Sequence, residues 1–176
     1  NDALFIGAAH SRVEPGARFS MAFDGNAPME AIGASDVSFY RPYFAFLRAR
    51  GTIASPSDVV NGDWLGSITV KGYSQGGYQR AGAIICKVNG NPGATYVPGR
   101  WEFRVMNDTG AFIQSLRITG SETIVNPDGL NHDFRVSGNT EPNLLFVDAS
   151  TDKVGIGTNN PQYELDVEGD IQAYAY

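Results

Sequence analysis

The chain has 176 residues, a formal net charge of −6, and hydrophobic and charged contents of 42% and 18%. This composition excludes a disordered chain, and the length suits one ordinary domain or two small ones. The acidic balance, with no cluster of lysine and arginine along the sequence, argues against a nucleic-acid partner. No run of about 18 apolar residues is present, which argues against membrane insertion.

Glycine is unusually frequent, at 21 of the 176 residues, because an average protein contains about 7% glycine. Turn-forming residues at this density favour many short strands over long helices. We therefore expect an all-β chain in three parts. These are an amino-terminal strand-rich segment (1–50), a small β domain (51–118) and a repetitive β shaft (119–176).

The first expected strands lie within residues 1–50. Phe19, Met21 and Phe23 alternate with other residues before a turn at 24–26, and a second alternation runs through residues 43–50. Alternation with a period of two is typical of strands. Because the chain begins with asparagine, we also expect it to be a piece of a longer protein.

The block 51–118 has the clearest strand pattern. Its expected strands are 64–70, 81–88, 100–106 and 112–118, separated by breaks at 72–77, 89–93 and 107–110. Within 100–106, one face carries Trp101, Phe103 and Val105, and the other carries Glu102, Arg104 and Met106. This pattern indicates a sheet with one wet face, and we expect Trp101 in the core of a small sandwich-like or barrel-like unit.

Cys86 is the only cysteine and cannot form an internal disulfide. It lies in phase with Ile84 and Val88 of the same expected strand. The pattern predicts a small buried apolar residue and not a reactive thiol.

A short pattern recurs in the region 119–176. The apolar residues Val125, Val136, Val147, Ile156 and Val167 follow one another at spacings of 11, 11, 9 and 11 residues. Strands this short are marginal alone and need neighbours, and a period near ten residues is typical of a stacked array. Winding several identical chains around one axis, preferably three, would close their exposed edges. The sequence itself does not count the chains.

Two stretches resemble a known class of protein. Residues 48–56, followed by 60–68 and Gly72-Tyr73, resemble a segment common in bacteriophage tail fibre and tailspike proteins. Residues 153–158, then Pro161 and 165–171, resemble the shaft that immediately precedes an endosialidase-type intramolecular chaperone domain. Together these stretches cover roughly residues 48–172.

The resemblance implies a virion tail fibre, assembled as a homotrimeric fibre with an intertwined β shaft. It further implies that the trimer recognises the host surface, with a glycan or an outer-membrane component as the partner. In such proteins the chaperone follows the shaft and cuts itself off at a Ser-Asp junction. Neither the chaperone nor its cleavage serine is among these residues.

Enzymatic motifs are missing from the sequence. His10 and His132 stand outside any motif, and no nucleophile elbow or metal-ligand spacing is present. The enzyme alternative is a polysaccharide depolymerase, which needs two carboxylates about 5–10 Å apart. Asp58, Asp63 and Glu102 are its candidates. We expect no catalysis and no cofactor or metal.

An acidic stretch, 148–152, resembles a cation-binding loop only superficially. It lacks the glycine and the distal glutamate of a helix-loop-helix calcium site. A turn between two strands is the favoured interpretation.

Candidate ligand-binding residues are aromatic or amide side chains in expected loops or at a strand start. They are Tyr73, Gln75, Tyr78, Tyr96 and Trp64. Aromatic faces beside hydrogen-bonding groups suit sugars, because they offer large contact area at low entropic cost. Packing of the tyrosines in a subunit interface is the alternative. At the level of the whole chain, a purely structural fibre or capsid-decoration piece and a depolymerase both stay open.

Overall fold

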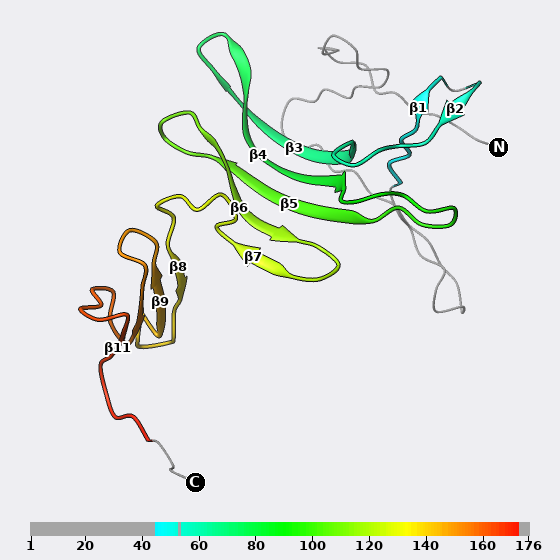
Figure 1. Ribbon diagram of the computed structural model, residues 1–176. Helices are drawn as coiled ribbons and strands as arrows, with labels where there is room; N and C mark the ends of the chain where they lie inside the picture. The colour runs from blue at the N-terminus through cyan, green and yellow to red at the C-terminus, as the bar shows by residue number, and fades with distance from the viewer. Residues whose placement is uncertain (1–44, 53, 173–176) are drawn as a thin grey trace, which may run out of the picture. The chain divides into compact units, whose positions relative to one another are not determined.

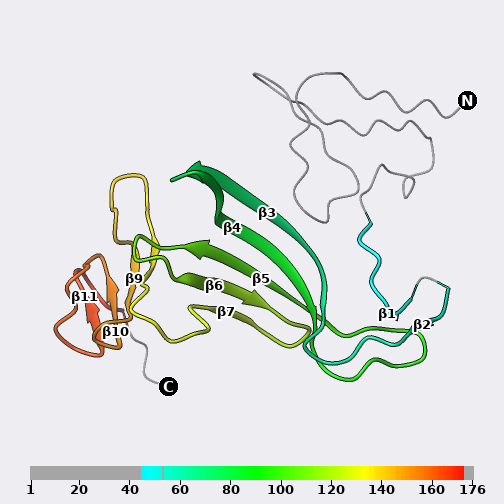
Figure 2. The same ribbon diagram turned by 90° about the horizontal axis from the view of Figure 1, so that it is seen from above.

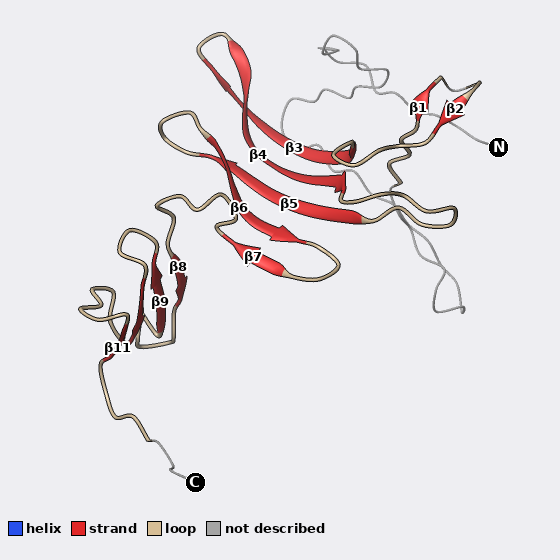
Figure 3. Ribbon diagram, viewed as in Figure 1, coloured by secondary structure: helices blue, strands red, loops and turns tan. Residues whose placement is uncertain are grey.

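The computed structural model describes residues 45–52 and 54–172, all within the unit Phe46–Tyr176 apart from Ala45 (Figure 1). The strand expected at 19–23 lies outside the described residues, and so do residues 43 and 44. The rest of the strand expected at 43–50 is wrong, because residues 45–49 form no strand and only Arg50 does, at the start of β1. The described part of the chain contains strands and turns and no helix (Figure 3), so the prediction of an all-β chain is confirmed. No helix in this part could cross a membrane.

The largest sheet has five antiparallel strands that follow one another in chain order (Figure 2). They are β3 (Trp64–Ser74), β4 (Gly77–Val88), β5 (Gly99–Met106), β6 (Phe112–Ile118) and β7 (Thr123–Val125). The four strands expected between residues 64 and 118 all exist. The fifth, β7, lies beyond the boundary expected at residue 118 and pairs with β6.

The break expected at 72–77 is wrong. β3 and β4 continue through it as a long hairpin, and only Gln75 and Gly76 form the turn. Both turn residues have positive φ, 48° and 86°. Two-residue turns with positive φ at both positions match the right-handed twist of paired strands, so the hairpin closes without a loop.

A second sheet contains four short strands in the order β11-β10-β9-β8. They are β8 (Phe134–Val136), β9 (Leu145–Asp148), β10 (Lys153–Ile156) and β11 (Leu165–Val167). These strands carry four residues of the recurring apolar pattern, Val136, Val147, Ile156 and Val167, and their neighbours come from the same chain. The first residue of the pattern, Val125, lies on β7 of the five-stranded sheet. A separate two-stranded ribbon joins β1 (Arg50–Gly51) to β2 (Pro56–Ser57).

β10 and β11 pair in parallel although only residues 157–164 connect them. Parallel strands usually need a crossover of a dozen or more residues. Here the Lys153 Nζ donates to the carbonyl oxygens of Pro161 at 3.2 Å and Gln162 at 3.1 Å. These hydrogen bonds hold the short crossover against the strand that it leaves.

Apolar burial within the described residues is small. The hydrophobic side chains that are less than a tenth exposed are Val59, Ala83, Ile85 and Val88. Trp101, expected in the core, is instead 48% exposed. Its neighbours on the same face, Phe103 and Val105, are 36% and 46% exposed. The expectation for Trp101 failed because alternation identifies a face of a sheet but not whether a second layer covers it.

Candidate functional site

The register of the five-stranded sheet separates its side chains onto two faces of different chemistry. Because successive residues of a strand point to opposite faces, Ile85, Glu102 and Arg117, which stand side by side on β4, β5 and β6, share one face. We call this the ionic face. It carries Trp64, Lys71, Tyr73, Tyr78, Arg80, Ile85, Lys87, Arg100, Glu102, Arg104, Phe112, Gln114 and Arg117.

The opposite face is almost wholly apolar, and we call it the apolar face. It carries Ile68, Val70, Ile84, Cys86, Trp101, Phe103, Val105, Leu116, Ile118 and Val125. Cys86 is a free thiol on this face, and it is only partly buried, whereas a buried residue was expected. Its partial burial raises the pKa of the thiol, which opposes thiolate formation.

Glu102 is the centre of the ionic face. Its carboxylate accepts from Lys87 Nζ at 2.9 Å, Arg100 Nε at 2.8 Å and Arg104 Nε at 2.9 Å. The residue is only 1% exposed. Burial by itself raises the pKa of Glu102, but the hydrogen bonds from the three cations outweigh it and lower the pKa to about 2. Glu102 is therefore ionised at any physiological pH.

Gln114 extends this cluster onto β6. Its Oε1 accepts from Arg104 Nη2 at 3.1 Å and from Arg117 Nη2 at 3.3 Å. The Nε2 atom of Gln114 and the Nε atom of Arg117 are buried donors without a partner in the described part of the chain. Arg117 also lies 4.0 Å from an Asp128 carboxylate oxygen. Two buried donors thus lack an acceptor beside a cationic cluster.

Aromatic rings lie against cations at the edges of the ionic face. The Arg80 guanidinium lies 4.9 Å from the centre of the Phe112 ring, and Lys87 Nζ lies 4.7 Å from the Trp64 ring. At these distances the ring quadrupole attracts the cation. The rings therefore keep both cations on the ionic face.

Three of the predicted binding residues meet at the tip of the β3–β4 hairpin. The rings of Tyr73 and Tyr78 are opposite one another, with centres 5.4 Å apart in an edge-to-face arrangement, and Gln75 occupies the turn. Both rings are more than half exposed. Trp64 begins β3 at the other end, roughly 30 Å away at the usual rise of a strand.

Tyr96, the fifth predicted residue, lies in the β4–β5 loop beyond Val88 and is exposed. Its carbonyl accepts from the backbone amide of Gly93 at 3.0 Å. The loop lines a cavity of about 620 Å³ together with Asp58 and Val59. The five predicted residues therefore do not form one site, because two groups lie at opposite ends of the hairpin.

Two of the three carboxylates considered for a depolymerase, Asp63 and Glu102, are held in ion pairs. Asp63 forms a bidentate pair with Arg50, at 2.7 and 2.8 Å, and also accepts from the Val60 amide at 3.0 Å. The hydrogen bond from Arg50 is the main cause of the lowered pKa of Asp63. Glycosidases raise the pKa of their general acid, whereas Asp63 and Glu102 both have a lowered pKa.

The acidic stretch 148–152 forms the turn between β9 and β10, as predicted. Asp148 Oδ1 accepts from the Ser150 amide at 2.8 Å and the Thr151 amide at 3.2 Å, and Oδ2 accepts from Thr151 Oγ1 at 2.8 Å. The side-chain hydrogen bonds from Ser150 and Thr151 lower the pKa of Asp148. Elsewhere, too, the described residues hold no group of three metal-ligating side chains.

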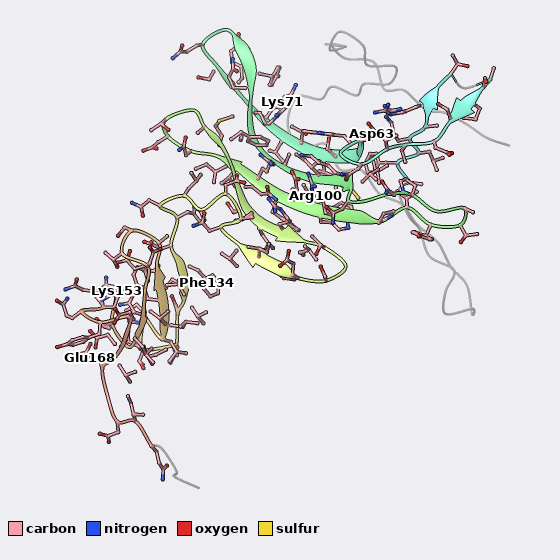
Figure 4. All side chains as sticks on the ribbon, in the orientation of Figure 1. Asp63, Lys71, Arg100, Phe134, Lys153 and Glu168 are labelled. Carbon is pink, nitrogen blue, oxygen red and sulfur yellow. The ribbon has the colours of Figure 1, made fainter. Side chains whose placement is uncertain are left out.

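Sequence reasoning missed the ionic face. Its cations are scattered along the sequence, from Arg80 to Arg117, and only strand pairing brings them together. One signal was present, because Arg100, Glu102 and Arg104 alternate along β5 and so must share a face. Figure 4 labels two residues of the ionic face on the five-stranded sheet, Lys71 on β3 and Arg100 on β5.

No protein-family model matches this chain, and no curated protein matches its sequence. The resemblance to tail fibre and tailspike proteins therefore stays a prediction.

Proposed function

We propose that this chain is a segment of a bacteriophage tail fibre or tailspike that attaches the virion to a glycan on the host surface. The chain acts as a homotrimer. The observation that carries the proposal is the apolar face. A sheet that exposes large hydrophobic side chains on one face lacks a second layer to bury them. Exposed apolar patches of this kind mark interfaces.

The trimer completes that layer. Three copies related by a closed rotation bring their apolar faces together, and symmetric self-association is the common solution for soluble oligomers. Trp101, Phe103 and Val105, each more than a third exposed in one chain, then form a shared core. In this assembly, sheets of different chains pack face to face and form the sandwich-like unit that the sequence predicts. The short strands of different chains wind around one another and form the predicted intertwined shaft.

The four-stranded sheet supports the same arrangement. Phe134, Val136 and Leu165 are exposed in the single chain. They lie on the two edge strands, β8 and β11, whose outer edges pair with no other strand of the described chain. Free edges beside exposed apolar side chains invite pairing with another copy.

Attachment without catalysis is the function that the described side chains favour. Exposed aromatic rings stand beside amide and charged groups at both ends of the β3–β4 hairpin, a composition that suits sugars. The lowered pKa of the Asp63 and Glu102 carboxyls disfavours a depolymerase. A host outer-membrane component other than a glycan is the alternative ligand.

The assembly is tested by light scattering and one matched pair of variants. We expect a mass three times the 18.9 kDa of the chain. Val105→Asp should give monomers, because each copy would bury an unpaired carboxylate in the interface. Val97→Asp is the control, since Val97 in the β4–β5 loop is 48% exposed against 46% for Val105. A wild-type mass of one chain, stable on dilution, would refute the trimer.

Attachment is tested with labelled trimer on host cells. We expect the trimer to stain the cells and to block infection by the phage. A structural spacer or a capsid-decoration piece would do neither. Release of reducing ends from host capsular polysaccharide above the buffer level would replace the proposal with a depolymerase.

A further inference from the structure

The ionic face carries far more positive than negative charge, although the whole chain is acidic. Among the described residues, five of its cations lie in or beside the Glu102 cluster, namely Arg80, Lys87, Arg100, Arg104 and Arg117, and the described carboxylates that contact this group are Glu102 and Asp128. Five cations against two carboxylates leave an excess of three positive charges, on a chain whose net charge is −6. Such segregation concentrates a positive potential on one face.

Glu102 holds several cations in place but accepts hydrogen bonds from only some of their donor atoms. Arg100 and Arg104 both donate to it through Nε. Among the described residues, Arg100 Nη2 and Arg117 Nη1 donate no hydrogen bond. The side chains of Arg100, Arg104 and Arg117 are between 21% and 30% exposed. Their outer donors are therefore within reach of a ligand.

Unsatisfied donors point to the same kind of ligand. Nε2 of Gln114 and Nε of Arg117 are buried and have no acceptor in residues 45–52 and 54–172. A buried donor without a partner is costly, and an oxygen acceptor relieves that cost. Beside several cations the acceptor that binds best is an anionic oxygen, since charge-assisted hydrogen bonds are the stronger ones.

We propose that the ionic face binds the acidic groups of an anionic polysaccharide, whether these are carboxylates or phosphate esters. This inference rests on the proposed function, because it names the class of glycan that the fibre takes. The apolar face, on the other side of the same sheet, meets the neighbouring chains. The ionic face is thereby left to the ligand.

The distribution of side chains favours a polysaccharide over a nucleic acid. Exposed rings of Trp64 and of Tyr73 and Tyr78 lie on the same face as the cations, toward the two ends of the hairpin. They offer apolar surface to sugar rings. The excess charge is confined to this one patch, and the acidic remainder of the chain repels a long, densely charged backbone.

The test measures binding of the full 176-residue chain to immobilised polymers by interferometry. The probes are polygalacturonate for carboxylate, a phosphomannan for phosphate, neutral dextran, and duplex DNA. We expect one or both acidic polysaccharides to bind, with an affinity that falls as salt is raised from 0.15 to 0.5 M, because screening weakens charge interactions. Dextran should not bind, and DNA should bind more weakly than the better polysaccharide.

Variants locate the site. Arg80→Gln and Arg117→Gln should each weaken binding about tenfold, the usual effect of losing one charge-assisted hydrogen bond. Arg80 lies over the Phe112 ring and is not one of the cations that bind Glu102, so its loss leaves the Glu102 cluster intact. Arg117→Lys should recover part of the affinity. Arg135→Gln on β8 is the control, because it changes net charge equally but lies on the other sheet.

Several results would overturn the inference. These are equal binding of acidic and neutral polymers, tighter binding of DNA than of either acidic polysaccharide, and equal weakening by the Arg135 control. If the trimer stains host cells but binds neither acidic polymer, this inference is wrong and the proposal of host attachment is unaffected. A trimer that binds an acidic polymer at the ionic face, but neither stains cells nor blocks infection, removes attachment alone.

Discussion

Replacing Glu102 with glutamine removes the carboxylate that Lys87, Arg100 and Arg104 share. Burial raises the pKa of Glu102, yet the hydrogen bonds from the three cations lower it from 4.5 to about 2. Each pKa unit corresponds to 1.36 kcal/mol, so the ionised carboxylate contributes about 3 kcal/mol to the free energy of unfolding at neutral pH. We expect Glu102→Gln to lose that amount at pH 7.

The loss should depend on pH in a defined direction. A carboxyl whose pKa is lower in the folded state stabilises the fold above its unfolded pKa, here 4.5, and this stabilisation disappears as pH falls toward about 2. The difference between wild type and Glu102→Gln should therefore shrink from about 3 kcal/mol at pH 7 to about 1 kcal/mol at pH 3. Asp63 and Asp148, whose pKa values are also lowered, keep their effect in both proteins.

Urea unfolding followed by circular dichroism measures this difference. Urea is preferred to guanidinium, which is itself a salt and screens the ion pairs. Both proteins are compared at one concentration, because the stability of the proposed trimer would depend on it. Glu122→Gln, an exposed glutamate in the β6–β7 turn, is the control and should change little. A loss below about 0.5 kcal/mol at pH 7, or one that is constant down to pH 3, would refute the reasoning.

Two further variants test local packing. Gly155→Ala should destabilise the four-stranded sheet by about 1–3 kcal/mol, because the added methyl group would overlap the carbonyl oxygen of Thr158. Faster hydrogen exchange in β10 measures it, and Gly120→Ala, where the methyl meets nothing, should leave exchange unchanged. Tyr73→Ala and Tyr78→Ala should show a coupling of about 1 kcal/mol in a double-mutant cycle of urea unfolding, because their rings touch. Additive losses would show that the ring contact contributes nothing.

Strand positions were predictable where local pattern decides them. The strand 112–118 was predicted to the residue, and the alternation of Trp101 with Glu102 placed these side chains on the faces where the structure has them. The turn at 148–152 was also predictable, because an aspartate followed by serine and threonine supplies its own hydrogen bonds.

Other features depended on information that no local pattern contains. The hairpin through 72–77 was missed because its glycines were interpreted as breaks, whereas only Gln75 and Gly76 needed positive φ. The parallel pairing of β10 with β11 depends on the crossover at 157–164 and on the hydrogen bonds of Lys153. The ionic face required the register of three strands. Its cations are therefore invisible to a search for basic runs.

The two tryptophans of the chain lie on opposite faces of one sheet, Trp64 beside Lys87 on the ionic face and Trp101 on the apolar face. Each is about half exposed in the single chain. Intrinsic fluorescence therefore contains two separate reporters, which single-tryptophan variants would resolve. Under the proposed assembly, the emission of Trp101 reports the association of copies through the apolar face, and the emission of Trp64 reports the binding of a ligand to the ionic face.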